Sequence, residues 1–124
     1  IYNYSFLYKS LSFSDNFYIP RPYKNVESAW LAFPLIFKAK LASKRKYIQT
    51  FLEKSGIQTR TIFTGNIMRQ PISKKFKWDC FGTFEVSDMV MKSGILVGLH
   101  NNQTQEKLNY LVYKILEAEK IFSN

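Results

Sequence analysis

The stretch from Gly56 to Pro71 reads GIQTRTIFTGNIMRQP, and the rest of the chain can be placed outward from it. Apolar and polar side chains alternate from Gln58 to Phe63, which predicts a short strand with one buried face. Thr64-Gly65-Asn66 follows as a turn, because glycine adopts a positive φ without steric strain. The stretch therefore predicts a helix end at Gly56, a strand, and a tight turn into a polar loop.

Two elements are expected upstream of this stretch. Lys44 to Ser55 predicts a helix with Ser43 as its N-cap, because Tyr47, Ile48, Phe51 and Leu52 fall on one face. Ala29 to Lys38 (AWLAFPLIFK) is strongly apolar and predicts a strand. Pro34 lies inside that run and cannot donate to a strand ladder, so it indicates an edge strand or a bulge.

The first residues predict another amphipathic helix. Tyr4, Leu7, Tyr8 and Leu11 follow the i, i+3, i+4, i+7 spacing. Residues 12 to 18 are expected to be the exit from this helix. Pro20 and Pro22 then predict an extended connector, since proline disfavours helix for itself and for the residue before it.

Downstream, Ile67 to Gly82 predicts a long irregular loop with one short helical turn, and a loop of that length is usually functional or packs on a partner. A short helix through Met91, capped by Ser87 or Asp88, is expected to end at Gly94. Ile95 to Leu99 predicts a third strand. Gln105 to Phe122 predicts the last helix, capped by Asn102 or Thr104.

Three strands with helices packed on one face make a small two-layer α/β (α+β) domain. The 124 residues, 46% of them hydrophobic and 17% aromatic, are enough for one domain with a modest core. No apolar run is long enough to predict a membrane-spanning helix, and no leader with a cleavage site is visible. The single cysteine, Cys80, excludes an internal disulfide, and a partly buried thiol in a reducing cytosol is favoured over a nucleophile. We therefore expect a cytoplasmic location.

The net charge of +9 favours anionic partners, which include nucleic acids, membrane surfaces and phosphate-bearing ligands. The two dense basic clusters are Lys44-Arg45-Lys46 and Lys74-Lys75-Phe76-Lys77. The sequence has no RNP-type aromatic motif, zinc finger or GXXG loop. A stand-alone module that binds nucleic acid or another anion therefore stays open as an alternative, with little support.

The sequence contains no phosphate-binding glycine loop, zinc motif or nucleophile elbow, so no catalytic, cofactor-binding or metal-binding residue is assigned. The polar set around the opening stretch is the candidate site: Arg60, Asn66, Arg69 and Gln70. Arginine binds phosphate or carboxylate with two hydrogen bonds, and Asn and Gln exchange hydrogen bonds with sugar hydroxyls. This mixture suits a sugar nucleotide. The alternative is that Arg60 pairs with an acid of the domain and Asn66 only supports the turn.

His100, at the end of the third predicted strand, is a further candidate for a ligand contact. A histidine that stabilises the turn, or is simply exposed, is the competing interpretation of this position. In both cases the side chain would lie where the strand leaves the sheet.

At this point the sequence resembles a known family. The order and spacing of five segments resemble the C-terminal part of the PLP-dependent sugar-nucleotide enzymes of the DegT type: Ser28–Pro34, Tyr47–Glu53, Gly56–Arg60, Phe63–Asn66 and Arg69–Pro71. The likeness is greatest to the CDP-4-keto-6-deoxy-D-glucose 3-dehydrase branch, whose pattern T-R-x-x-F-x-G-N-x-x-R-Q-P is matched from Thr59 to Pro71. The segment from Ser87 to Met91 also resembles the branch's N-T-D-x-I-M segment.

The resemblance implies the small C-terminal domain of an aminotransferase of fold type I, with residues 1–22 as the end of a linking helix and a connector, and 23–124 as the domain. It implies a role in deoxysugar and lipopolysaccharide biosynthesis, in which the whole enzyme removes the 3-hydroxyl of a CDP-sugar. The cofactor, PLP or its amine form PMP, would be held by a large N-terminal domain that this chain does not contain. A homodimer and a reductase partner are also implied.

Alone, the chain is expected to bind no cofactor, to be inactive and to expose apolar surface where the large domain docks. The candidates for this surface are aromatic: Phe6, Phe13, Phe17, Trp30, Phe76 and Trp78. A sugar-nucleotide aminotransferase is the close alternative to a dehydrase. The resemblance implies substrate contacts by Arg60, Asn66, Arg69 and Gln70. His100 departs from the aromatic residue of several relatives, and the Asn101–Gln103 turn departs from their usual Pro-Gly-like turn.

Overall fold

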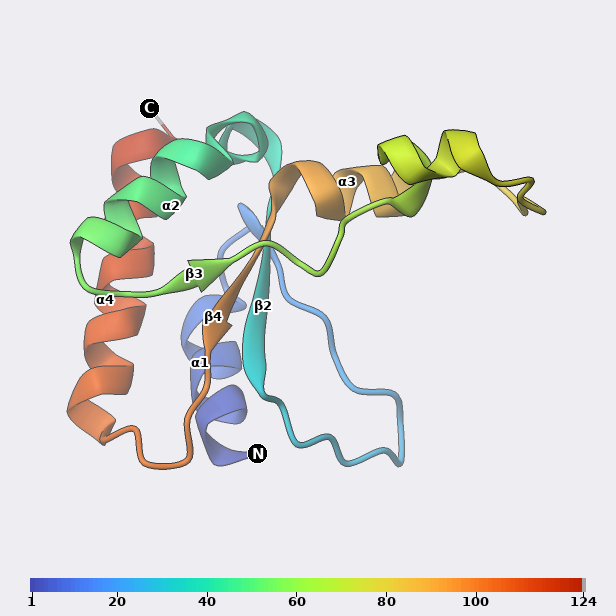
Figure 1. Ribbon diagram of the computed structural model, residues 1–124. Helices are drawn as coiled ribbons and strands as arrows, with labels where there is room; N and C mark the ends of the chain where they lie inside the picture. The colour runs from blue at the N-terminus through green and yellow to red at the C-terminus, as the bar shows by residue number, and fades with distance from the viewer. Residues whose placement is uncertain (124) are drawn as a thin grey trace.

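A four-stranded antiparallel sheet forms the centre of the computed structural model, which describes residues 1–123 (Figure 1). The strands are β1 (Phe17–Tyr18), β2 (Ala32–Phe37), β3 (Thr59–Arg60) and β4 (Gly94–Gly98), in the order β1-β2-β4-β3. Each of the three predicted strand segments contains a strand, namely β2, β3 and β4. The count of three is wrong, because β1 lies in the stretch predicted as a helix exit. Two residues are too short to show an alternating pattern, and β1 exists only through its pairing with β2.

Pro34 lies in β2, an inner strand of the sheet, but at a position that β1 does not reach. The backbone N–H of Leu99 donates to the carbonyl of Leu31, so the odd-numbered residues of β2 bond to β4. The nitrogen of Pro34 therefore points toward the opposite side, where β1 pairs only with Ile36 and Phe37. The proline costs no ladder bond, which agrees with the predicted edge position.

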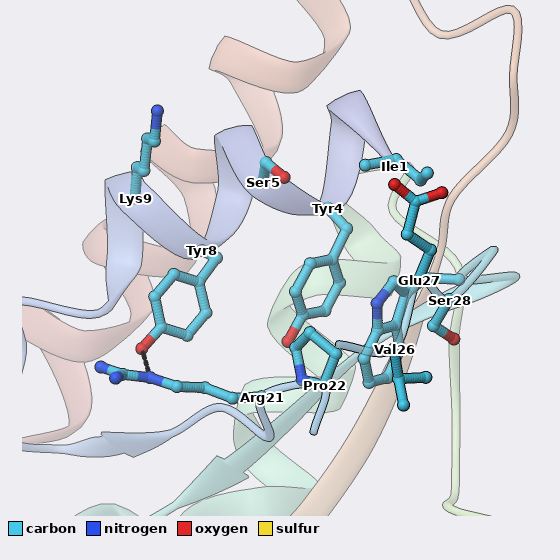
Figure 2. Close-up of a pocket in the computed structure, with 11 residues that line it drawn as sticks. Ile1, Tyr4, Ser5, Tyr8, Lys9, Arg21, Pro22, Val26, Glu27 and Ser28 are labelled. Atoms are coloured by element: carbon cyan, nitrogen blue, oxygen red, sulfur yellow. Dashed lines mark hydrogen bonds between the residues drawn. The ribbon is translucent and has the colours of Figure 1, made fainter. Parts of the chain in front are cut away.

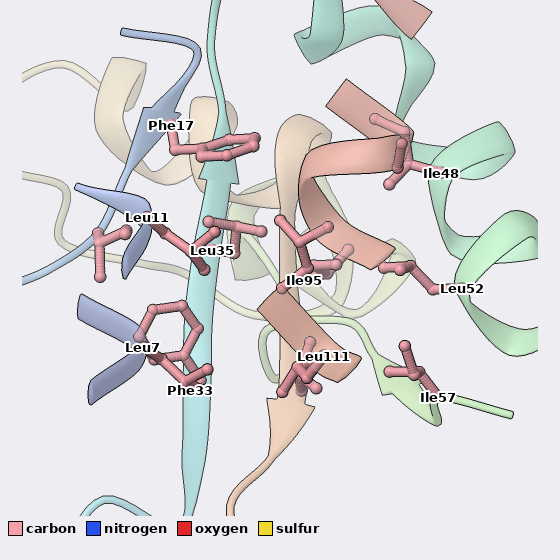
Figure 3. Close-up of a cluster of buried hydrophobic side chains, with 14 of the residues drawn as sticks. Leu7, Leu11, Phe17, Phe33, Leu35, Ile48, Leu52, Ile57, Ile95 and Leu111 are labelled. Carbon is pink, nitrogen blue, oxygen red and sulfur yellow. The ribbon is translucent and has the colours of Figure 1, made fainter. Parts of the chain in front are cut away.

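Three helices pack on one face of the sheet: α1 (Tyr2–Leu11), α2 (Arg45–Lys54) and α4 (Gln105–Phe122), with the 3-10 helix η1 (Ala39–Lys44) before α2 (Figure 1). We call the sheet together with these helices the packed layer. Its buried apolar side chains form one core between sheet and helices (Figure 3). Its largest fully buried members include Leu7, Leu11, Phe33, Leu35, Leu52, Ile95 and Ile115. The predicted two-layer arrangement with helices on one face is confirmed. None of the helices in residues 1–123 is long and apolar enough to cross a membrane.

The remaining elements extend from one end of the sheet. They are the 3-10 helices η2 (Ile67–Arg69) and η3 (Pro71–Lys75) and the helix α3 (Glu85–Ser93), which leads directly into β4. Residues 67–84, which we call the arm, project away from the packed layer (Figure 1). The predicted long loop is thus confirmed, with two short helical turns in place of one.

The polar alternation after Arg60 does not continue the strand. The prediction of a strand from Gln58 to Phe63 is wrong beyond Arg60, because Phe63 adopts a φ of 47° and is 88% exposed. Ile62 packs closely against Gly94: a Cβ added at Gly94 would lie 2.6 Å from Cδ1 of Ile62. The chain therefore leaves the sheet early and enters the turn at Gly65.

Helix caps divide into confirmed and wrong predictions. Thr104 caps α4 by accepting a hydrogen bond from the N–H of Lys107 at 3.3 Å, and Gly56 ends α2 with a φ of 77°. Ser43 is not the cap of α2, because it lies inside η1, which runs directly into α2. The hydroxyl of Ser43 donates to the carbonyl of Lys40 instead. The helix α3 begins before the predicted Ser87 or Asp88, and Phe84 takes the cap position without a side-chain bond.

Candidate functional site

The turn of the opening stretch closes against α3. Gly65 has a φ of 68°, and a Cβ at this position would lie 2.5 Å from Cγ of Met91. Only glycine fits both the backbone and the space. The next residue, Asn66, is buried, and its side-chain oxygen accepts a hydrogen bond from the N–H of Met68 at 3.0 Å. The polar turn is therefore a packed element rather than a free loop.

Asp88 on α3 gathers two of the predicted site residues. Its Oδ1 accepts a hydrogen bond from Nδ2 of Asn66 at 2.7 Å, and also one from Nε of Arg69 at 3.0 Å. Its Oδ2 accepts from Nη2 of Arg69 at 2.7 Å. We call Asn66, Arg69 and Asp88 the Asp88 cluster. Its two parallel guanidinium–carboxylate bonds fix the orientation of the planar guanidinium.

The electrostatics of the Asp88 cluster follow from these bonds. The hydrogen bond from Arg69, and then that from Asn66, lowers the pKa of Asp88 to about 2. The same bond raises the pKa of Arg69. Both groups are therefore ionised at neutral pH, and their charges cancel. Their side chains stay 55% and 37% exposed, so the pair lies at the surface.

Gln70, the third predicted residue of this loop, donates from Nε2 to the carbonyl of Thr64 at 2.8 Å. It also lines a cavity of about 310 Å³ together with Arg45, the loop 61–65 and Met91. The structure thus brings Asn66, Arg69 and Gln70 together on one loop.

Arg60 lies apart from this loop, at the end of β3. Its neighbour Thr59 points toward α2, where its hydroxyl donates to Glu53 at 2.7 Å, so strand alternation puts Arg60 on the other face of the sheet. Arg60 is exposed. The ion pairs within residues 1–123 are Arg69–Asp88 and Lys114–Glu117, so the described part of the chain does not pair Arg60 with an acid.

His100 is separated from the Asp88 cluster by the length of β4. The cluster lies near the start of that strand, and His100 follows its end, beside a second cavity of about 520 Å³. The ring Nδ1 accepts a hydrogen bond from the N–H of Asn102 at 3.1 Å, and the carbonyl of His100 accepts from Asn3 at 2.8 Å. These contacts match the turn-stabilising interpretation, and a shared ligand with Arg69 has no geometric support.

A third cavity, of about 490 Å³, lies between α1 and residues 21–30 (Figure 2). Tyr4 stacks on Trp30 with ring centroids 4.2 Å apart, and the guanidinium of Arg21 lies over the ring of Tyr8. Three of its polar side chains are used internally, because Tyr4 donates to the carbonyl of Pro20 and Arg21 donates to the hydroxyl of Tyr8. None of the predicted site residues lines this cavity.

The cavity beside the polar loop does not fit PLP. A PLP site needs a lysine beside an enclosed space and a carboxylate for the pyridine nitrogen. The cavity next to the polar loop is lined by neither, and the carboxylate of Asp88 is already held by Arg69 and Asn66. No group of three or more metal-ligand side chains gathers within residues 1–123.

The predicted aromatic surface is partly wrong. Phe17 is buried in the core, Trp30 stacks on Tyr4, and Phe6 packs against the core. The other three candidates are exposed: Phe13 at 70%, Phe76 at 61% and Trp78 at 40%. The arm adds Phe81, at 99%, which sequence reasoning did not include. Cys80, predicted to be partly buried, is exposed on the same arm.

Asp88 itself was missed as a site residue, because the sequence marks it only as a helix cap. Its separation from Asn66, 22 positions along the chain, hides the contact from any local pattern. The one available signal was its place in the segment from Ser87 to Met91 that resembles the family. Arg45 was likewise noted only as part of a basic cluster.

Comparison with known proteins places the chain beside enzymes that act on nucleotide sugars. It is 29% identical over 116 residues to the lipopolysaccharide biosynthesis protein RfbH of Salmonella typhimurium, which covers 93% of this chain and 26% of that protein. It is 30% identical over 106 residues to a GDP-4-keto-6-deoxy-D-mannose 3-dehydratase of Yersinia pseudotuberculosis, covering 85% of this chain and 27% of that enzyme. The chain thus spans about a quarter of the length of these relatives.

Solved structures support the fold. An E. coli GDP-4-keto-6-deoxy-D-mannose-3-dehydratase with bound hydrated PLP superposes with a TM-score of 0.80 at 23% identity, over 91% of this chain and 29% of that one. The Helicobacter pylori aminotransferase PseC superposes with a TM-score of 0.82 at 15% identity, over 98% of this chain and 32% of that one. The predicted aminotransferase-type fold is therefore confirmed. The profile of the DegT/DnrJ/EryC1/StrS aminotransferase family matches residues 3–116, and the chain belongs to that family.

Proposed function

We propose that this chain is the small, substrate-contacting domain of a PLP- or PMP-dependent nucleotide-sugar 3-dehydratase in deoxysugar and lipopolysaccharide biosynthesis. The Asp88 cluster is the observation that carries the proposal. It joins Asn66 and Arg69 of the T-R-x-x-F-x-G-N-x-x-R-Q-P segment to Asp88 of the other segment that resembles the dehydrase branch. Two segments far apart in sequence thus meet in one hydrogen-bonded unit at the surface.

In this proposal the chain binds and orients the substrate. Arg69 and Gln70 offer N–H donors on a loop that is held rigid by Gly65 and Met91, and such rigidity places donors without an ordering penalty at binding. Arg60, exposed and without an acidic partner in residues 1–123, adds a positive charge suited to phosphate. His100 has no part in this arrangement.

The cofactor would be held by a separate large domain of the same enzyme. When bound there, PLP or PMP supplies an electron sink for the sugar's ring carbons, and the protein supplies orientation and exclusion of water. A CDP- or GDP-linked 4-keto-6-deoxyhexose is the expected substrate class, since two of the curated relatives act on the GDP-linked sugar. A homodimer, a reductase partner and a cytoplasmic location belong to the same proposal.

An aminotransferase is the second candidate, because PseC superposes as well as the dehydratase does. The test is an assay of the complete protein that contains this chain, with PLP, glutamate and a panel of CDP-, GDP- and dTDP-4-keto-6-deoxyhexoses. Loss of the 3-hydroxyl, followed by mass spectrometry, supports the dehydratase. Appearance of a 4-amino sugar without loss of water contradicts it and supports the aminotransferase.

The isolated chain gives the complementary test. It should neither bind PLP nor convert any of these sugars, because the cavity beside its polar loop offers no lysine and the carboxylate of Asp88 is held by Arg69. Turnover by the 124 residues alone would contradict the assignment to a small domain. Retardation of oligonucleotides by the chain, lost steeply as salt rises, would instead support the nucleic-acid alternative.

A further inference from the structure

Arg69 looks from the sequence like an anion-binding residue, but its surroundings change what it can bind. Nε and Nη2 each donate to Asp88, which uses two of the five N–H donors of the guanidinium. One face of the guanidinium lies toward the ring of Phe84, 5.9 Å from its centroid. Three N–H donors remain without a partner in the described part of the chain, and the side chain is 55% exposed.

The carboxylate of Asp88 also offsets the positive charge of Arg69 that would attract a phosphate. An anion that approaches the outer edge of Arg69 meets a positive guanidinium and, immediately behind it, a negative carboxylate 2.7 Å away. The two fields oppose each other at that edge. A neutral acceptor, such as a hydroxyl or keto oxygen, gains the hydrogen bonds and has no charge to be repelled.

Asp88 further fixes where these donors point. Its Oδ1 accepts from Asn66, which caps η2, and both of its oxygens accept from Arg69, which ends η2. Arg69 therefore has one orientation relative to the cavity that Gln70 lines, since Gln70 follows directly in the chain and is tied to Thr64.

From these contacts we propose that Asp88 is a positioning residue that offsets the charge of Arg69, so that the guanidinium donates hydrogen bonds to the sugar part of the substrate rather than to its diphosphate. This inference rests on the proposed function and assigns its residues to parts of the ligand. The diphosphate is then left to cations outside the Asp88 cluster.

The test separates the two parts of the ligand. In the complete protein that contains this chain, calorimetry gives the Kd of a bare nucleoside diphosphate (CDP, GDP or dTDP) and that of its hexose conjugate (CDP-glucose, GDP-mannose or dTDP-glucose). The ratio of the two constants is the sugar contribution. Arg69→Gln keeps an amide donor but removes the charge, and Asp88→Asn removes the neutralising carboxylate. Glu117→Gln, at the partly buried ion pair of α4, is the control for loss of one carboxylate from an ion pair.

Arg69→Gln is expected to leave the Kd of the bare diphosphate within about threefold and to lower the sugar contribution by about fivefold, on the scale of one hydrogen bond. Asp88→Asn is expected to lower the sugar contribution by about tenfold and to tighten bare diphosphate by about threefold, because Arg69 is no longer neutralised. Glu117→Gln should change neither value by more than about twofold.

A loss of about tenfold or more in bare-diphosphate affinity in Arg69→Gln would overturn the inference, since Arg69 would then bind the phosphates. An unchanged sugar contribution in both cluster variants would also overturn it. If Asp88→Asn does not fold, Arg69→Gln decides alone, because it leaves Asp88 bonded to Asn66. A wild-type protein that binds neither the diphosphates nor their conjugates contradicts the proposed function itself, which is a distinguishable result.

Discussion

The packed layer and the arm are built on opposite principles. In the packed layer, Phe33 and its neighbours are fully excluded from water between sheet and helices. On the arm, Phe81 is 99% exposed and Phe76 is 61% exposed, and η3 packs against little besides η2. The same residue type thus serves as core in one region and as open surface in the other. Stability should therefore concentrate in the packed layer, and the arm should tolerate substitution unless another surface covers it.

The Asp88 cluster lies at the boundary between these two regions. It ties the root of the arm to α3 through one bidentate ion pair and one buried amide, and Gly65 packs against Met91 beside it. Few contacts therefore decide where the arm and the polar loop stand relative to the sheet. Substitutions at this boundary should lower the free energy of unfolding by less than those in the packed layer and by more than those on the arm.

The largest difference is expected between two phenylalanines. Phe33→Ala removes a fully buried ring that contacts Tyr4, and should lower the free energy of unfolding by about 4 kcal/mol. Phe81→Ala removes an exposed ring, and should change it by less than about 0.5 kcal/mol. Urea denaturation followed by circular dichroism measures both. Equal losses in the two variants would contradict the division into packed layer and arm.

Two glycines give the next largest effect. Gly65→Ala combines an unfavourable positive φ with the clash against Met91, and should destabilise by about 3 kcal/mol. Gly82 on the arm has nearly the same φ, 70°, but open space around it, so Gly82→Ala should destabilise by only about 1 kcal/mol.

The difference between the two variants isolates the contact with Met91. Adding Met91→Ala to Gly65→Ala should recover part of the loss, because the Cγ that meets the new Cβ is removed. Additive effects of the two substitutions in denaturation experiments would show that the close approach of turn and α3 does not determine the stability of the boundary.

Sequence patterns predicted the packed layer well, since its periodicity is local. Tyr4, Leu7 and Leu11 lie on the buried face of α1, and α4 runs over the predicted residues 105–122. The two-residue strand β1 was beyond such reasoning, because it depends on pairing with β2. The strand after Arg60 failed for a related reason: alternation continues in the sequence, but packing against Gly94 bends the chain away.

The candidate site divides in the same way. Asn66, Arg69 and Gln70 were predictable as neighbours because they are close in sequence, and the structure keeps them together. Asp88 was not, because a partner 19 to 22 positions away has no local signature. His100 was a candidate because it follows a predicted strand end, and β4 separates it from the other three. The boundary between residues 22 and 23 stays a prediction, with α1 and β1 contributing side chains to the core of the rest.

A smaller, pH-dependent effect is expected at the boundary. The pKa of Asp88 is about 2, below the ordinary value of about 3.9 for an unfolded aspartate. Its ionised form therefore stabilises the folded chain fully above about pH 5, and this contribution is lost progressively as the pH falls from there through about 2. The gap in unfolding midpoint between wild type and Asp88→Asn should be constant above about pH 5 and should close below about pH 4.

Arg69→Gln sharpens this prediction. Because the bond from Arg69 is the main cause of the low pKa, its removal should raise the pKa of Asp88, as followed by carboxyl carbon chemical shifts in NMR titrations. Asp79→Asn, a change of one exposed carboxylate on the arm, is the control for general charge effects. A pKa of Asp88 that does not respond to Arg69→Gln would mean that the ion pair does not hold the arm in solution.

The smallest effect concerns how the packed layer begins its helices. Thr104 caps α4 with a hydrogen bond to the N–H of Lys107, so Thr104→Ala should destabilise by about 1 kcal/mol. Ser43 precedes α2 but donates only to the carbonyl of Lys40 in η1, so Ser43→Ala should change stability by less than about 0.5 kcal/mol. Thermal denaturation of the two variants measures the contrast. A larger loss in Ser43→Ala would mean that α2 starts at Ser43 in solution, and that the packed layer depends on the capping chemistry that its sequence first suggested.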